Sequence, residues 1–216
     1  MTPHPLALGA VAELEAFRLP SSPDLPSDVP WPPRVACLGW NGRPKPNAIH
    51  YSRINTLAIM TRMIVGGFVG GELFISRTMS GLPNLLWAPL FDRVTSIASE
   101  GGTGPTIRDG KHTIHRGAIE DESFIHPVVA GVADLRAVVL DDRRYSELCC
   151  GYFHFKRVLK RPGIIVFLHV TGGDSSRGME RFLADLADGH LDNRQHEIVT
   201  VDEDPEGRGM AYEIVS

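Results

Sequence analysis

Residues 135–173 read LRAVVLDDRRYSELCCGYFHFKRVLKRPGIIVFLHVTGG, and this stretch decides the fold. An apolar run from Ala137 to Leu140 stops at two aspartates, and a second run from Ile164 to Val170 follows a Pro-Gly turn. Apolar runs bounded by turn residues are typical of buried strands. Between them apolar residues recur at helical spacing, namely Leu148, Tyr152, Phe155 and Leu159. The pattern therefore predicts a strand, a helix and a parallel strand joined as a right-handed βαβ unit.

Asp141 and His169 stand at or near the carboxyl ends of these two strands. In open α/β sheets ligands bind beyond those ends. Asp141 is therefore a candidate catalytic residue, and its alternative role is the N-cap of the helix that starts near Tyr145. His169 is the second candidate, because a neutral imidazole accepts a proton from a substrate hydroxyl. Its alternative role is a hydrogen bond at the edge of the sheet.

The same segment resembles the second half of class I S-adenosylmethionine-dependent methyltransferases. It is most similar to the small branch of sugar and antibiotic-tailoring O-methyltransferases and cephalosporin-hydroxylase-like proteins. The resemblance is carried by Asp141, by Lys160-Arg161-Pro162-Gly163 and by Phe167-Leu168-His169. It implies an α/β fold with a Rossmann-like, mostly parallel sheet, helices on both faces and a C-terminal antiparallel hairpin. In that branch a metal-binding aspartate stands where this chain has His169.

The order of the predicted elements extends the resemblance over residues 48–216. The hydrophobic patterns predict strands and helices at 48–65, 68–76, 94–98, 113–116, 179–186, 196–201 and 210–215. Residues 1–47 contain ten of the 16 prolines and form a separate N-terminal arm. The arm covers a cofactor cleft or forms a contact between subunits of a homo-oligomer, or it only packs on the domain.

The resemblance also implies a cofactor site. The first strand of the family ends in an acidic residue and a glycine-rich run, through which the backbone approaches the cofactor. Glu72 takes the acidic position, and Phe74 and Ser76 take glycine positions, so the ring of Phe74 would face the space of the methionine moiety. At the end of the second strand, where the family has an acid that holds the ribose hydroxyls, Ala98 stands at the usual position, and Glu100, two residues on, is the candidate for this role. Asp121, after the third, takes the place of the acid that contacts the adenine amino group, with a solvated turn as the alternative.

These residues predict an S-adenosylmethionine-dependent O-methyltransferase-like enzyme for a small molecule, in which His169 or Asp141 acts on the acceptor hydroxyl. The alternative is a relative of the same fold that has lost its cofactor. It would serve as an assembly or regulatory subunit or perform another small-molecule reaction, and Phe74 and Ala98 favour it. A divalent metal held by Asp141, Asp142 and His169 is a further alternative. Carboxylates with one imidazole suit Mg²⁺ or Mn²⁺ poorly to fairly, so the metal is kept only as an alternative and no metal ligand is predicted.

Composition limits the partners. The 216 residues are 43% hydrophobic and 22% charged, as is usual for a globular domain, and the net charge is -4. That charge gives no long-range attraction to nucleic acid or to an anionic membrane. No apolar run approaches the roughly 18 residues that span a bilayer. Three cysteines without C-x-x-C spacing predict a reduced, cytoplasmic setting.

Overall fold

The protein folds around one seven-stranded sheet. The structure is a computed structural model that describes residues 34–36, 50–77, 87–98, 112–142, 144–170, 177–201 and 209–216. The strands lie in the order β5-β4-β3-β6-β7-β9-β8. Their bounds are Glu72–Ile75 (β3), Arg93–Ala98 (β4), His112–Arg116 (β5), Leu135–Leu140 (β6), Gly163–Phe167 (β7), Val199–Val201 (β8) and Met210–Val215 (β9). Strands β3 to β7 are parallel, and β9 is antiparallel to both β7 and β8.

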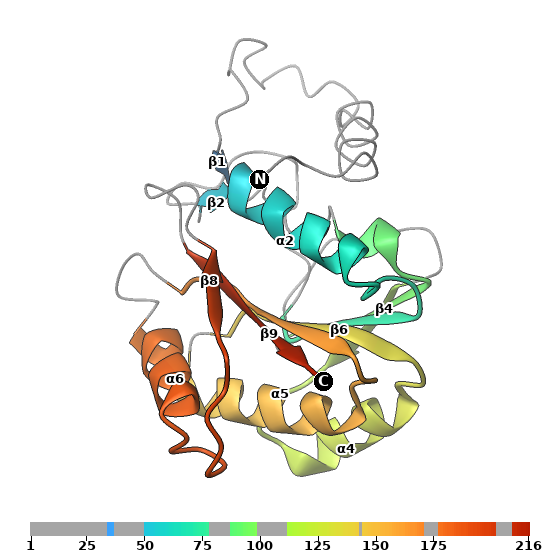
Figure 1. The fold of residues 1–216 in the computed structure, drawn as a ribbon. Helices are drawn as coiled ribbons and strands as arrows, with labels where there is room; N and C mark the ends of the chain where they lie inside the picture. The colour runs from blue at the N-terminus through green and yellow to red at the C-terminus, as the bar shows by residue number, and fades with distance from the viewer. Residues whose placement is uncertain are drawn as a thin grey trace.

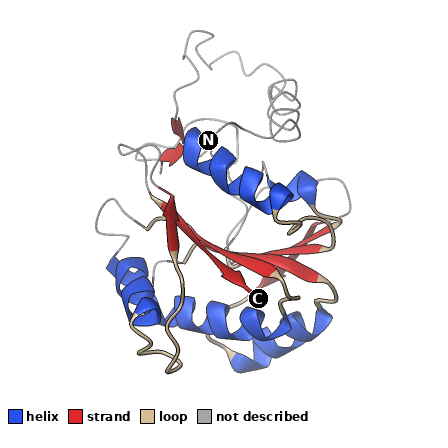
Figure 2. Cartoon of the chain, viewed as in Figure 1, coloured by secondary structure: helices blue, strands red, loops and turns tan. Residues whose placement is uncertain are grey.

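Helices cover both faces of this sheet (Figure 1). Helix α2 (Arg53–Val65) lies on one face, and α4 (Glu122–Gly131), α5 (Tyr145–Val158) and α6 (Arg177–Ala187) form a layer on the other. Coloured by secondary structure, the molecule shows the sheet between these two helical layers (Figure 2). A short 3-10 helix, η1 (Ala88–Leu90), precedes β4. The predicted α/β fold, with its mostly parallel sheet, its C-terminal antiparallel pair and helices on both faces, is confirmed.

The βαβ unit predicted from residues 135–173 is β6-α5-β7. Buried residues of α5 recur at the predicted spacing, with Leu148, Tyr152 and Phe155 fully covered. The helix begins after Arg144, whose backbone N–H donates to Glu147 Oε2 at 3.4 Å. Asp141 is therefore not the N-cap of α5. Strands β6 and β7 pair directly, with Leu140 opposite Phe167, so both strands end at the same edge of the sheet.

Two apolar cores hold the layers together, because alternate side chains of each strand point to opposite faces. Leu73 and Ile75 of β3 pack under α2, whereas Phe74 packs with α5 on the other face. Burial of these strands on both faces explains their continuous apolar runs.

Part of the predicted N-terminal arm is described. Strand β1 (Arg34–Ala36) pairs antiparallel with β2 (His50–Ser52) in a two-stranded sheet separate from the main one. The predicted helix at 48–65 thus begins later, at Arg53, after β2. The lid, subunit-contact and packing roles of the arm stay predictions.

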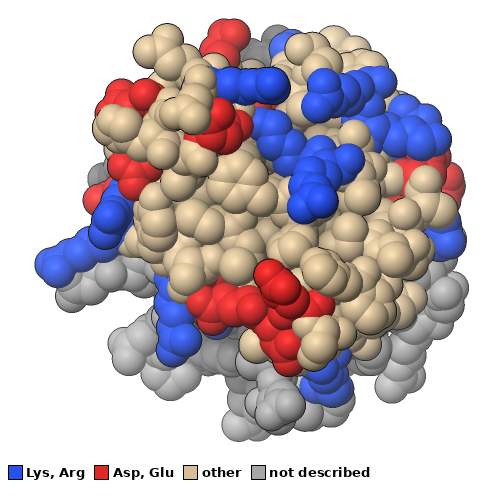
Figure 3. Space-filling model, turned by 90° about the horizontal axis from the view of Figure 1, so that it is seen from below, with Lys and Arg blue, Asp and Glu red and all other residues tan. Residues whose placement is uncertain are grey.

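The surface of the α4-α5-α6 layer carries charges of both signs (Figure 3). Lysine and arginine side chains gather toward one part of this face, and a group of acidic side chains lies toward another. Exposed basic residues at the end of α5 are Arg157, Lys160 and Arg161. Within the described residues, each helix is too short or too polar to cross a bilayer.

Candidate functional site

Asp141 and His169 form a buried hydrogen-bonded pair at the carboxyl edge of the sheet. Asp141 follows β6 and His169 lies two residues beyond β7. His169 Nε2 is 2.6 Å from Asp141 Oδ1, and the two side chains are 3% and 9% exposed. A carboxylate only accepts, so Nε2 carries the proton and donates it to Asp141. The sequence placed these two residues at neighbouring strand ends, and the structure brings them into contact.

The backbone at His169 has an unusual conformation. Its φ angle is 60°, in the left-handed region that non-glycine residues rarely adopt. The residues on either side are held by backbone bonds, from Leu168 N–H to Leu140 O and from Val170 N–H to Gly209 O, both 3.0 Å. Such conformations persist where surrounding structure enforces them, and they are frequent at functional sites.

Ser76 and Asp142 complete the arrangement, and we call Ser76, Asp141, Asp142 and His169 the carboxyl-edge cluster. Ser76 directly follows β3, and its Oγ accepts the backbone N–H of Asp141 at 3.0 Å. The cluster therefore lies where β3 and β6 meet, the point at which strand order reverses and ligands bind in doubly wound sheets. Of the predicted cofactor residues that the structure describes, Ser76 is the one that contacts Asp141.

Asp142 is the least satisfied group of the cluster. It is 3% exposed, and its Oδ2 has no hydrogen-bond partner among the described residues. Oδ2 lies near Gly151, where an added Cβ would be 3.9 Å from it. Burial raises the pKa of Asp142 to about 7, against the hydrogen bond with Ser76, and the charge of Asp141 adds to the rise. A buried acceptor without a donor is costly, so it indicates either a bound proton or a ligand.

Glu72 lies at the opposite edge, which corrects the prediction that it lines the cofactor site. It is the first residue of β3 and stands opposite Arg93 and Leu135, the first residues of the neighbouring strands. Its carboxylate accepts from Thr95 Oγ1 at 2.6 Å and from the backbone N–H of Ala133 at 3.4 Å. Glu72 is therefore a buried acid that joins strands at the amino edge.

Phe74 also differs from its prediction. Its ring is fully buried and stacks on Phe155 of α5, with centroids 3.4 Å apart and planes 14° apart. The ring therefore points into the core between sheet and helix rather than beyond the end of β3. The objection to cofactor binding that rested on Phe74 is removed.

Asp121 is the N-cap of α4. Its Oδ1 accepts from Ser123 N–H at 2.9 Å and from Ser123 Oγ at 2.7 Å, and these bonds lower the pKa of the carboxyl. The side chain is exposed and engaged in its own helix, which is closer to the predicted solvated turn than to an adenine contact. Glu100, the predicted ribose-binding residue, lies outside the described residues.

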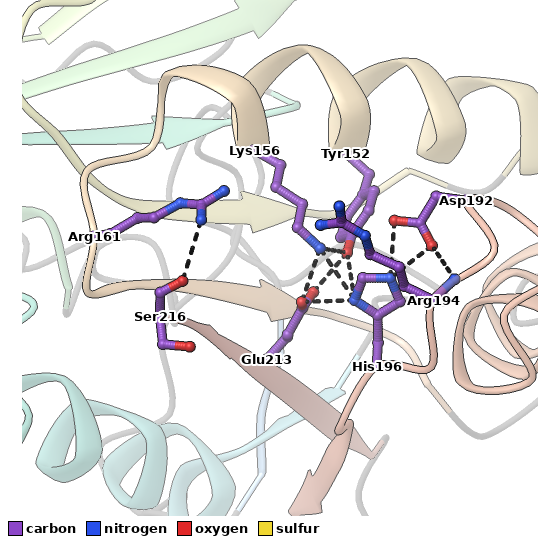
Figure 4. Close-up of polar contacts among 8 residues, drawn as sticks. All are labelled: Tyr152, Lys156, Arg161, Asp192, Arg194, His196, Glu213 and Ser216. Carbon is purple, nitrogen blue, oxygen red and sulfur yellow. Dashed lines mark hydrogen bonds and ion pairs between the residues drawn. The ribbon is translucent and has the colours of Figure 1, made fainter.

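A second ionisable cluster, which the sequence analysis missed, lies between α5 and β9 (Figure 4). We call Tyr152, Lys156, His196 and Glu213 the α5-β9 cluster. Tyr152 Oη donates to Glu213 Oε2 at 2.7 Å and Lys156 Nζ to Oε1 at 2.9 Å, while Lys156 also contacts Tyr152 Oη. His196 Nδ1 is 2.9 Å from Oε1, and its Nε2 is 2.9 Å from Asp192 Oδ1. The i,i+4 spacing of Tyr152 and Lys156 was the one local signal for it.

Burial and the carboxylate of Glu213 raise the pKa of Tyr152 above its ordinary value. The phenol therefore keeps its proton and serves as a hydrogen-bond donor. Both oxygens of Glu213 have donors, so this cluster is internally satisfied.

The carboxyl-edge cluster does not fit a hard divalent metal. Asp141 Oδ1 already contacts His169 Nε2, so a bound ion would have to separate the two side chains. Among the described residues, no three His, Cys, Asp or Glu side chains are arranged around one metal position. Mg²⁺ and Mn²⁺ prefer several oxygen ligands, and we assign no chemical step here to a metal.

Comparison with known proteins finds similarity in the fold. The sequence matches no family model and no curated protein. A proposed caffeoyl-CoA O-methyltransferase from Staphylococcus aureus superposes with a TM-score of 0.52 at 15% identity, over 76% of this chain and 84% of that one. A proposed O-methyltransferase from Klebsiella pneumoniae gives 0.52 at 12% identity, over 79% and 83% of the two chains. CalS11, a TDP-rhamnose 3'-O-methyltransferase of calicheamicin biosynthesis, gives 0.50 at 10% identity, over 75% and 79%.

This chain therefore has the fold of the class I S-adenosylmethionine-dependent methyltransferases. The three structural neighbours named above all carry O-methyltransferase names, in line with the resemblance of residues 135–173.

Proposed function

We propose that this protein transfers a methyl group from S-adenosylmethionine to a hydroxyl group of a small molecule, with His169 as the general base. One observation carries the proposal: a buried Asp-His pair lies at the carboxyl ends of two adjacent central strands, with 2.6 Å between Nε2 and Oδ1. This edge is where sheets of this kind bind their ligands.

The pair is suited to removing a proton. With the Nε2 proton donated to Asp141, the basic lone pair of the neutral ring lies on Nδ1. When Nδ1 takes the proton of the acceptor hydroxyl, the carboxylate of Asp141 stabilises the imidazolium that forms. A base of this kind contributes about 10²- to 10⁴-fold to a rate. Asp141 is thus a positioning residue and His169 the group that contacts the acceptor.

Among the described residues, Ser76 and Asp142 are best placed to hold the polar groups of the cofactor. The buried Oδ2 of Asp142 is an acceptor without a partner among the described residues, which fits an amino or hydroxyl donor. Bound S-adenosylmethionine would supply a methyl group on a positively charged sulfur. The work left to the chain is to align the acceptor oxygen with that methyl group and to take up the proton.

Calorimetry of the full chain with S-adenosylmethionine and S-adenosylhomocysteine tests the proposal first. We expect binding that Asp142→Ala weakens and that Asp188→Ala, a change of an exposed acid at the end of α6, leaves unchanged. Transfer of a tritiated methyl group to a panel of small hydroxyl compounds then tests the reaction. Absence of heat at millimolar ligand would overturn the enzyme proposal and favour a cofactor-free subunit of the same fold.

A further inference from the structure

Two imidazoles meet on the helical layer, outside the carboxyl-edge cluster. His126 belongs to α4 and His154 to α5, and these helices pack side by side in one layer (Figure 1). The ring centroids are 5.5 Å apart and the ring planes make an angle of 76°. His126 is exposed and His154 is half-buried, so the pair is accessible from solvent.

Two side chains of types that can bind metals stand one helical turn before the two histidines. Glu122 precedes His126 by four residues on α4, and Cys150 precedes His154 by four residues on α5. Residues at this spacing share a helix face. Burial raises the pKa of Cys150, and the charges of Glu120 and Glu122 raise it further. The charge of Glu122 also opposes the lowering of the pKa of His154, as expected for an acid near both helices.

The state of His154 favours metal binding. Burial lowers its pKa, and the neighbouring charges of His126 and Arg157 lower it further. Neutral imidazole is the form that binds metals, and burial of His154 favours that form. The positive charge of Arg157 opposes a cation, so a site here would be of moderate affinity.

We propose that His126 and His154 form a two-histidine site for a borderline divalent metal such as Zn²⁺, Ni²⁺ or Cu²⁺, which clips α4 to α5. Imidazole nitrogens bind Zn²⁺ at about 2.0–2.1 Å, so two rings on one tetrahedral ion have centroids about 5 Å apart. The observed 5.5 Å is close to that separation. No third described donor is already in place, so water completes the coordination unless Glu122 or Cys150 rotates inward. Imidazole and thiol donors exclude Mg²⁺ and Ca²⁺ as the preferred ions.

Calorimetric titration with ZnCl₂ and NiCl₂ tests the proposal on the full chain, freed of metal and without an added histidine tag. We expect one ion per chain with micromolar affinity. His126→Gln and His154→Gln should each weaken binding at least about tenfold, because each removes one of two protein ligands. His190→Gln is the matched control, since His190 is an exposed histidine near Asp185 on α6, and it should bind as the wild type does.

Thermal unfolding gives a second readout. A ligand that binds only the folded chain raises its midpoint, so Ni²⁺ should raise Tm of the wild type and of His190→Gln but not of His126→Gln. Wild-type binding by both single variants, or no binding of either ion at millimolar concentration, would overturn the proposal. Because His126 is exposed, its substitution leaves the core intact and the comparison interpretable.

Discussion

Two buried clusters of ionisable side chains lie on this sheet. They differ in whether every oxygen of their buried carboxyl groups has a hydrogen-bond donor. In the α5-β9 cluster both oxygens of Glu213 receive donors, from Tyr152 and Lys156 (Figure 4). In the carboxyl-edge cluster Asp141 is paired with His169, but Oδ2 of the neighbouring Asp142 has no donor among the described residues.

The difference separates a structural network from a functional one. A satisfied buried network rigidifies the fold, because each group would be costly to leave unpaired. An acid kept buried without a donor lowers stability, and such groups concentrate where ligands bind. We therefore expect changes in the α5-β9 cluster to affect stability and changes in the carboxyl-edge cluster to affect reactivity and its dependence on pH.

The largest expected effect is on the proposed reaction. His169→Asn should lower the rate of methyl transfer by about 10²- to 10⁴-fold, because the base is removed while the volume of the side chain is nearly kept. Asp141→Asn should lower it less, since His169 remains but loses the carboxylate that stabilises its charged form. Single-turnover transfer of a labelled methyl group measures both, with unfolding curves as the check on folding. If His169→Asn transfers the methyl group at a rate within threefold of the wild-type rate, the carboxyl-edge cluster is not a functional cluster.

Asp142→Asn should change how stability depends on pH. The pKa of Asp142 is about 7 in the folded chain, against an ordinary value of 3.8 for an aspartate. Between these two pH values the folded state therefore keeps a proton on Asp142, whereas the unfolded state has lost it. Stability should therefore fall as pH rises from about 4 to about 7 and then stay level. The loss is up to roughly 4 kcal/mol, because one pH unit corresponds to about 1.4 kcal/mol.

An asparagine has no proton to lose, so this part of the decrease should be absent in Asp142→Asn. Urea unfolding from pH 4.5 to pH 8 measures the difference between the two proteins. If the free energy of unfolding changes with pH in the same way in both proteins, Asp142 has the same pKa in the folded and the unfolded chain. The interpretation of Asp142 as a buried acid without a donor would then be wrong.

Glu213→Gln should destabilise the protein by about 3 kcal/mol, because it leaves the ammonium of Lys156 buried without its carboxylate. The double variant Glu213→Gln with Lys156→Met removes the stranded charge and should recover part of the loss. Urea unfolding midpoints measure both. If Glu213→Gln alone is neutral, the α5-β9 cluster is not the stabilising network that the comparison requires.

The sequence predicted the β6-α5-β7 unit, and the position of Asp141 and His169 at the ends of its strands, because both depend on local patterns. These patterns are two apolar runs, the apolar stripe of the helix between them and the turns that join them. It misplaced Glu72 because residues 68–76 were taken as one strand. Gly70 and Gly71 have φ angles of 74° and 59°, so the chain turns there and β3 starts only at Glu72. That shift moves the acid from the middle of the predicted strand to the first residue of β3, at the amino edge.

The α5-β9 cluster could not be predicted from the sequence in the same way. Tyr152 and Glu213 are separated by 61 residues, and their contact depends on the antiparallel register of β9 against β7. A shift of one residue in that register would turn Glu213 to the opposite face.

The smallest predicted effect extends the comparison to the amino edge, where Glu72 is a third buried acid. Thr95→Val removes the hydroxyl that donates to Glu72 Oε1 at 2.6 Å and nearly keeps the shape of the side chain. We expect a loss of about 1.5 kcal/mol, the lower end for a hydrogen bond to a charged group, because Ala133 N–H and Arg93 remain near the other oxygen. Thr200→Val is the matched control, since Thr200 is exposed on β8 and its change should stay within about 0.5 kcal/mol. If Thr95→Val and Thr200→Val are equally stable in urea, the hydrogen bond from Thr95 to Glu72 does not stabilise the fold. Hydrogen bonds to a buried carboxylate would then not be what marks the structural clusters of this protein.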